Sequence, residues 1–105
     1  MQVCVRWVGS VLLVAGSALA QDGANGPRPV PQCIMCHGLL GHSNTPDAPH
    51  LAGQPRMYLI TQLKAFRSGS RQHAVMNVIA KPLTDDDIAA AAGWYNAVAL
   101  DVCKP

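Results

Sequence analysis

Charged and aromatic side chains are both scarce in this chain. Lysine, arginine, aspartate and glutamate make up 13% of the 105 residues, and the formal net charge is +2. So small a positive excess excludes the basic stripe of a nucleic-acid-binding domain, and an apolar content of 50% excludes a disordered polyelectrolyte. A single short domain with 5% aromatic residues buries a modest core, so we expect a staple: disulfide bonds, a metal or a large bound group.

The alternation of apolar and polar residues that is typical of β-strands is also missing, as are internal repeats and low-complexity tracts. The 8 prolines and 9 glycines predict long loops instead, above all over residues 38–53. Prolines at alternate positions make residues 21–30 an extended, proline-rich leader. We therefore predict an all-α fold with long loops.

Helix signals occur in four places. A short helix can begin at Pro31, because proline is tolerated in a first turn. A proline in the first turn and a glycine after the last residue predict a helix over 55–68, and a helical turn is expected at 75–80. The clearest helix starts at Thr84, which with Asp87 resembles a capping box. The apolar stripe that this last helix is expected to bury consists of Ile88, Ala91, Ala92, Tyr95, Ala99 and Val102.

The first 20 residues resemble an export signal. Arg6 precedes an apolar run, and the small residues around Ala20 form a pattern that signal peptidase cleaves after. The alternative is an uncleaved membrane anchor, but the run is shorter than the about 20 residues that a membrane-spanning helix needs. We expect a signal peptide over 1–20, cleaved after Ala20, and a domain over 31–105 with no membrane span in the mature chain.

The four cysteines need an explanation, and Cys4 would leave with the signal. The mature chain would keep Cys33, Cys36 and Cys103, and an odd number outside the cytoplasm argues against a simple disulfide framework. We expect Cys103 to be a free or intermolecularly paired thiol near the C-terminus.

Residues 33–37 read Cys-Ile-Met-Cys-His, the signature of c-type haem attachment. Two thiols within one turn can add to the two vinyl groups of haem, and His37 then lies under the iron as its proximal ligand. Two other interpretations stay open. One is a disulfide of thioredoxin type between Cys33 and Cys36, which needs a βαβ context that is absent here. The other is half of a zinc site, although no second Cys-x-x-Cys or His-x₃-His pair exists to complete it.

With this motif the chain resembles a class I c-type cytochrome, most closely the small bacterial monohaem branch. The resemblance rests on Gly38 after the haem motif, on Pro-His-Leu-Ala-Gly-Gln at 49–54, and on the patterns of residues 58–71 and 83–95. It covers nearly the whole mature chain. It implies the class I cytochrome c fold, in which three to four helices and long loops surround one covalently bound haem c.

The resemblance implies a methionine as the second axial ligand, on a loop between the middle and last helices. Met76 lies in that loop, whereas Met1 leaves with the signal, Met35 lies between the two cysteines and Met57 lies in a first helical turn. The expected iron ligands are therefore His37 and Met76. A gap-filling core residue is the alternative role for Met76, and His73 is the alternative ligand.

The resemblance also implies residues that support the haem. The carbonyl of Pro49 is expected to accept the Nδ1–H of His37, and Leu51 is expected to pack on the same haem face. The candidates to form hydrogen bonds with the haem propionates are Tyr58, Gln54, Arg67 and Arg71. The alternative is that these side chains only form solvated faces of their helices. Relatives usually carry a full N-terminal helix that crosses the last helix near Trp94 and Tyr95, and the prolines here leave little room for it.

Together these features predict a periplasmic electron-transfer protein that is not an enzyme and carries one electron on a His/Met-ligated haem c. We expect redox partner proteins to dock transiently at a haem edge near Ile34, Met35 and Leu39, and we expect a monomer without a nucleic-acid partner. Because the net charge is small, strong steering by one sign of charge is not implied. Two alternatives stay open: a haem-bearing subunit of a periplasmic dehydrogenase or oxidase complex, and a haem sensor or peroxidase-like protein with an open iron site.

Overall fold

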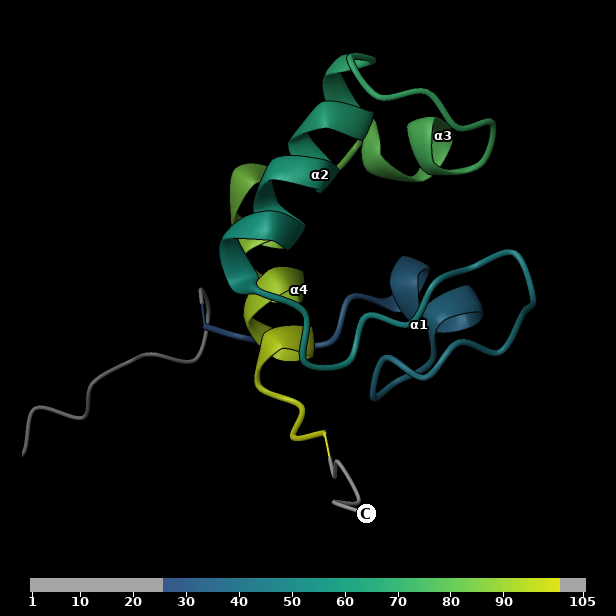
Figure 1. The fold of residues 1–105 in the computed structure, drawn as a ribbon. Helices are drawn as coiled ribbons and strands as arrows, with labels where there is room; N and C mark the ends of the chain where they lie inside the picture. Colours follow the sequence, from purple (N-terminus) through teal and green to yellow (C-terminus); the bar gives the residue numbers. More distant parts are fainter. Residues whose placement is uncertain (1–25, 101–105) are drawn as a thin grey trace, which may run out of the picture.

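Four helices and no strand occur in residues 26–100, the part of the chain that this computed structural model describes. The all-α prediction is confirmed there (Figure 1). The signal predicted at 1–20, the start of the leader and Cys103 lie outside the described residues. The helices are α1 (Pro31–His37), α2 (Arg56–Ser68), α3 (Met76–Ala80) and α4 (Asp85–Asn96).

Helix α1 is short because residues at both of its ends stop it. Pro31 lies in the first turn, as predicted, and follows Val30 in an extended conformation. Gly38, with a φ of 77°, ends the helix directly after His37. The whole haem motif therefore lies on two helical turns. Cys33 and His37, four residues apart, are buried on the same face, whereas Met35 is 78% exposed.

Helix α2 packs against both α3 and α4 (Figure 1). Leu59 and Phe66 face the core from α2, and Gly69 ends the helix in the left-handed conformation, as predicted. The predicted start at Pro55 is one residue early, because Pro55 has an extended ψ of 130° and is the N-cap. The buried side chains of the core are Val30, Cys33, Leu59, Phe66, Ala80, Leu83, Ile88, Ala91, Ala92 and Tyr95.

Helix α4 begins with the predicted capping box. The Thr84 hydroxyl accepts from the Asp87 amide at 3.1 Å, and the Asp87 carboxylate accepts from the Thr84 amide at 3.0 Å. The helix ends at Asn96, so the predicted buried stripe was too long: Ala99 is exposed, and Val102 lies outside the described residues. The Tyr95 carbonyl accepts from Gly53 N–H at 2.9 Å and from Val98 N–H at 3.3 Å, so the chain turns here and does not continue the helix.

An extended segment, not a helix, crosses α4 at the N-terminal side of the domain. The Arg28 amide donates to the Ala90 carbonyl at 3.3 Å, and the Arg28 guanidinium pairs with Asp87 at 2.7 Å. Pro27 lies so close to Gly93 that a Cβ there would come within 3.0 Å of the proline ring. The expectation that the prolines displace the N-terminal helix is therefore confirmed for residues 26–30, and the extended segment covers α4 in its place.

Candidate functional site

The two cysteines of α1 are free thiols in the structure, Cys33 buried and Cys36 half-buried. Burial raises the pKa of the Cys33 thiol to about 11. Thioether formation with haem uses thiols, and no disulfide bond joins Cys33 to Cys36 in the structure. Within residues 26–100, no three histidine, cysteine or carboxylate side chains gather in a way that could hold a metal ion such as zinc.

His37 is buried, with 7% of its surface exposed, and it is oriented by the following loop. Its Nδ1 bonds to the Pro49 carbonyl at 2.8 Å, as the resemblance implied. A carbonyl can only accept, so Nδ1 carries the proton and Nε2 keeps a lone pair. An imidazole held in this way is set to bind iron through Nε2, and the hydrogen bond makes it a stronger ligand.

The loop over residues 38–53 is braced by two aromatic side chains of α4. Trp94 Nε1 donates to the Leu39 carbonyl at 2.7 Å, and the Tyr95 hydroxyl donates to the Gly38 carbonyl at 2.9 Å. Burial raises the pKa of Tyr95 to about 12, so the phenol stays neutral and remains a donor. The sequence predicts that Tyr95 is buried, but it does not predict this bracing, because no local signal links α4 to the loop.

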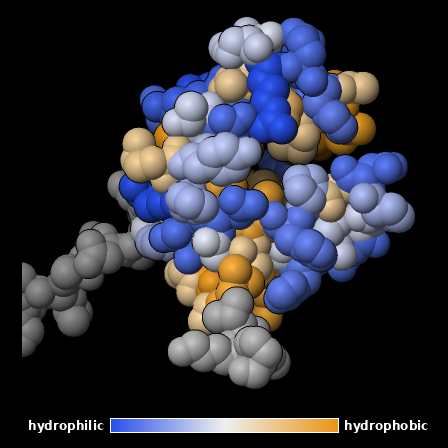
Figure 2. Space-filling model, in the orientation of Figure 1, coloured by the Kyte–Doolittle hydropathy of each residue, from blue (hydrophilic) through white to orange (hydrophobic). Residues whose placement is uncertain are grey.

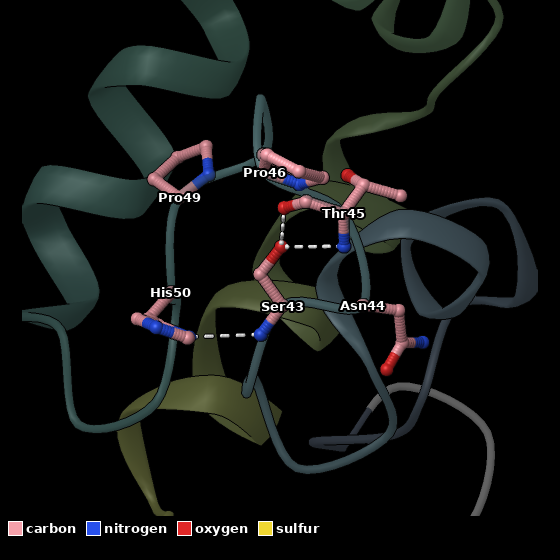
Figure 3. A pocket seen from close by; sticks show the side chains of 7 residues that line it. Ser43, Asn44, Thr45, Pro46, Pro49 and His50 are labelled. Carbon is pink, nitrogen blue, oxygen red and sulfur yellow. Dashed lines mark hydrogen bonds between the residues drawn. The ribbon is translucent and has the colours of Figure 1, made fainter.

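The same loop folds onto α1 next to Ser43, where the Asn44 amide donates to the Cys36 carbonyl at 2.9 Å. Figure 3 shows Ser43 and the loop residues around it. The Ser43 hydroxyl lies 3.2 Å from the Cys36 carbonyl, and the Ser43 amide donates to His50 Nδ1 at 2.8 Å. An open concavity of about 510 Å³ lies beside these contacts. The residues that line it are Ser43, Asn44, Thr45, Pro46, Ala48, Pro49 and His50.

Met76, the candidate second ligand, is the first residue of α3 and is partly buried against the core. Met57 is 64% exposed and Met35 is 78% exposed. His73 Nδ1 accepts from the Met76 amide at 3.2 Å, which helps to hold the first turn of α3. The rival ligand therefore already has a local structural role beside Met76.

Both arginines among the four propionate candidates are held by close contacts with other residues. Arg67 donates to the Leu83 carbonyl at 2.9 Å and pairs with Asp85 at 2.7 Å, so it ties α2 to the start of α4. Arg71 donates to Gln62 at 2.7 Å and lies over the Phe66 ring. These contacts favour the alternative that both arginines have structural roles on helix faces and do not bind the propionates. The side chains of the other two candidates are less constrained. Tyr58 is 47% exposed, and Gln54 makes a long 3.4 Å contact with the His50 carbonyl.

Apolar side chains surround the region between α1 and α3. Figure 2 shows the surface hollowed between the part formed by α2 and α3 and the part formed by α1 and its loop, with hydrophobic residues in the hollow. The exposed large apolar residues on these elements are Met35, Leu39, Leu40, Met57, Tyr58, Val75 and Val78. A large flat apolar group such as haem fits this hollow, because it would cover apolar side chains that are otherwise in water, with Met35 and Leu39 left at its edge.

Comparisons with known proteins find a matching family and several similar chains. The model of the family described as cytochrome c matches residues 13–95. The chain is 38% identical over 81 residues to cytochrome c-554(548) of Halomonas halodenitrificans, which covers 74% of this chain and 98% of that protein. It is 33% identical over 97 residues to cytochrome c4 of Pseudomonas aeruginosa, over 89% of this chain and 48% of that protein.

Other similar proteins are longer than this chain. The thiosulfate dehydrogenase electron acceptor of Thiomonas intermedia is 42% identical over 74 residues, which are 70% of this chain and 34% of that protein. A solved structure of Acidithiobacillus ferrooxidans cytochrome c4 is 38% identical, with a TM-score of 0.60 over 66% of this chain and 40% of that one. The chain thus spans nearly all of the Halomonas protein and less than half of the others.

Proposed function

Because this chain belongs to the cytochrome c family of electron carriers, with covalently bound haem c, we propose that it is a periplasmic carrier of one electron on a single haem. One Cys-x-x-Cys-His motif occurs in the sequence, which supports one haem per chain. The export signal expected at 1–20 supports the location. Within the described residues, no helix is long and apolar enough to cross a membrane.

In this proposal Cys33 and Cys36 form the thioether bonds, and His37 Nε2 and the Met76 sulfur ligate the iron. The observation that carries it is the 2.8 Å bond from His37 Nδ1 to the Pro49 carbonyl. That bond fixes the tautomer, holds the ring plane and leaves Nε2 as the ligating nitrogen.

Met76 would complete the ligation from the opposite part of the molecule, at the start of α3. A thioether is a soft ligand that favours ferrous iron and raises the reduction potential. It would also fill the position that oxygen or carbon monoxide needs, so the iron cycles between its two states without binding substrate. Leu51, half-buried two residues after Pro49, would pack on the His37 side of the haem.

Electrons would leave at the haem edge near Ile34, Met35 and Leu39. Met35, within the haem motif, is 78% exposed, and Leu39, two residues after it, is 50% exposed. An exposed apolar edge of this kind suits weak, transient docking of redox proteins, in which a small interface releases quickly.

A second candidate is an electron acceptor dedicated to one dehydrogenase. Two relatives, from Thiomonas intermedia and Stutzerimonas stutzeri, bear the name thiosulfate dehydrogenase electron acceptor, and this chain spans 34% and 38% of their lengths. Co-purification from the native source separates the two candidates, since a dedicated acceptor stays with its enzyme and a free carrier does not.

The test of the proposed function is the visible spectrum of the protein after expression with haem-maturation machinery. We expect one haem per chain that acid-acetone does not extract, and a reduced form that does not bind carbon monoxide. Free extraction of the haem would overturn the covalent attachment. Ready binding of carbon monoxide would instead show an open iron site and favour the sensor or peroxidase-like alternative.

A further inference from the structure

A ring of contacts joins His37 to the loop that supports it. His37 Nδ1 bonds to the Pro49 carbonyl, and that carbonyl belongs to the same peptide unit as the His50 nitrogen. The His50 side chain accepts at Nδ1 from the Ser43 amide, at 2.8 Å (Figure 3). Ser43 Oγ lies 3.2 Å from the carbonyl of Cys36, which precedes His37 in α1. The Pro49–His50 peptide is thus held by His37 on one side and by Ser43 on the other.

We propose that His50 is a positioning residue that makes the reduction potential of the haem depend on pH, because its neutral ring, and not its protonated ring, can accept from the Ser43 amide. This inference rests on the proposed ligation of iron by His37. A ring nitrogen accepts a hydrogen bond through its lone pair, and protonation converts that nitrogen into a donor. Two donors then face each other, so the contact between His50 and Ser43 opens.

Protonation of His50 affects the haem through two effects of the same sign. The added positive charge disfavours ferric iron relative to ferrous iron. Opening of the Ser43 contact also frees one side of the Pro49–His50 peptide, which weakens the hydrogen bond that strengthens His37 as a ligand. Weaker donation by His37 again favours ferrous iron, so the reduction potential is higher when the ring is protonated.

The surroundings of His50 contain one other titratable ring. His42 lies against it, with ring centroids 5.9 Å apart and an angle of 65° between the planes. The residues that line the concavity beside His50 are all uncharged: Ser43, Asn44, Thr45, Pro46, Ala48 and Pro49. Asp47 is exposed in the same loop and is not among them. Because both histidines are exposed, the experiment has to separate their titrations.

The experiment measures the reduction potential of the holoprotein between about pH 5 and pH 8, where histidines titrate. His50→Gln is the key variant, because a glutamine oxygen can accept from the Ser43 amide but does not titrate. His42→Gln is the matched control on the same loop. We expect the potential of the wild type and of His42→Gln to fall as the pH rises, and that of His50→Gln to stay constant.

A second readout follows the contact itself. In NMR spectra of the ferrous protein, the Ser43 amide resonance should move with pH in the wild type, with the same midpoint as the potential, and should not move in His50→Gln. A potential that still falls in His50→Gln, or that becomes constant in His42→Gln, would overturn the inference. A stationary Ser43 resonance would overturn the positioning role. Failure of the proposed function is distinct, because it appears at once as a missing or altered haem spectrum at every pH.

Discussion

At the scale of single residues, Tyr95 fixes the backbone at the point where it leaves His37. Its hydroxyl bonds to the carbonyl of Gly38, and the side chain is 1% exposed. Gly38 follows the proposed iron ligand directly, so this bond sets the direction in which the supporting loop begins. The orientation of His37 therefore depends on a residue of the last helix.

Replacing Tyr95 with phenylalanine should destabilise the protein. The change removes the hydroxyl and leaves the buried Gly38 carbonyl with only the 3.3 Å contact from the Gly41 amide, a loss that costs about 1 kcal/mol. We expect the free energy of unfolding of the holoprotein, measured by denaturant titration, to fall by about that amount. Tyr58→Phe is the control, because Tyr58 is 47% exposed, and it should change little. Equal stability of both variants would show that the bond to Gly38 contributes nothing.

Replacing Met76 with alanine should open the iron site. We expect the weak sulfur-to-iron band of the ferric protein to vanish and the reduced protein to bind carbon monoxide. The potential should drop, on the order of a hundred millivolts or more, because the axial ligand strongly sets haem potentials. Met57→Leu, at a residue that is 64% exposed, should do none of these. If Met57→Leu loses the band and Met76→Ala keeps it, the ligand assignment is wrong.

At the scale of elements, the first turn of α4 joins three segments of the chain. Arg67 brings α2 to Asp85, and Arg28 brings the extended N-terminal segment to Asp87. The carboxylates of this turn also face the positive end of the helix dipole. The turn is therefore a joint between elements as well as a helix cap.

This joint should weaken in acid. Hydrogen bonds from Thr84 lower the pKa of Asp87, and the hydrogen bond from Arg67, with the charge of Lys64, lowers the pKa of Asp85. A carboxyl whose pKa is lowered by folding contributes stability that is fully present above the ordinary aspartate pKa, and this contribution is lost as the pH falls from there through the lowered pKa of the folded state. We expect the free energy of unfolding to fall there in the wild type and to fall less in Asp87→Asn.

The controls of this experiment lie in the same turn. Asp86→Asn, at an exposed neighbouring position, should keep the acid dependence of the wild type. Thr84→Ala should lower stability by about 1 kcal/mol at neutral pH, the usual loss for an N-cap. An acid dependence that is the same in Asp87→Asn and in the wild type would contradict the role given to this carboxylate.

At the scale of the whole molecule, the protein core is small. It lies among α2, α3 and α4, and α1 adds Cys33 to it. The loop over 38–53 rests on hydrogen bonds to α4 more than on apolar burial. A covalently held haem would therefore supply much of the missing core, as expected for a chain of this length.

The protein without haem should consequently be largely unfolded. A double variant, Cys33→Ser with Cys36→Ser, prevents covalent attachment, and its circular dichroism should show little helix and no cooperative thermal transition. Cys103→Ser is the matched control at a cysteine outside the described residues. It should keep the haem, the visible spectrum and the melting temperature of the wild type. A cooperative transition of the double variant at the temperature of the holoprotein would contradict this expectation.

The sequence predicts what local chemistry decides. Helix starts at Pro31 and Thr84 and the helix end before Gly69 follow from the backbone preferences of those residues, and the structure confirms them. The contact between His37 and Pro49 was implied by a family pattern and is present. Contacts between distant segments could not be predicted from local sequence. Examples are the packing of residues 26–30 on α4 and the hydrogen bonds from Trp94 and Tyr95 to the loop over 38–53.

The hydrogen bond between Tyr95 and Gly38 can form only late in the synthesis of the chain. The two residues are 57 positions apart, and a ribosome adds about 5–20 residues per second, so Gly38 exists for on the order of 3–10 seconds before Tyr95 does. During this interval the Cys-x-x-Cys-His segment has been made, but the last helix that braces its loop has not. The loop after the motif can therefore be braced only once the C-terminal helix has been made, and a chain that stops before Tyr95 leaves the motif beside an unbraced loop.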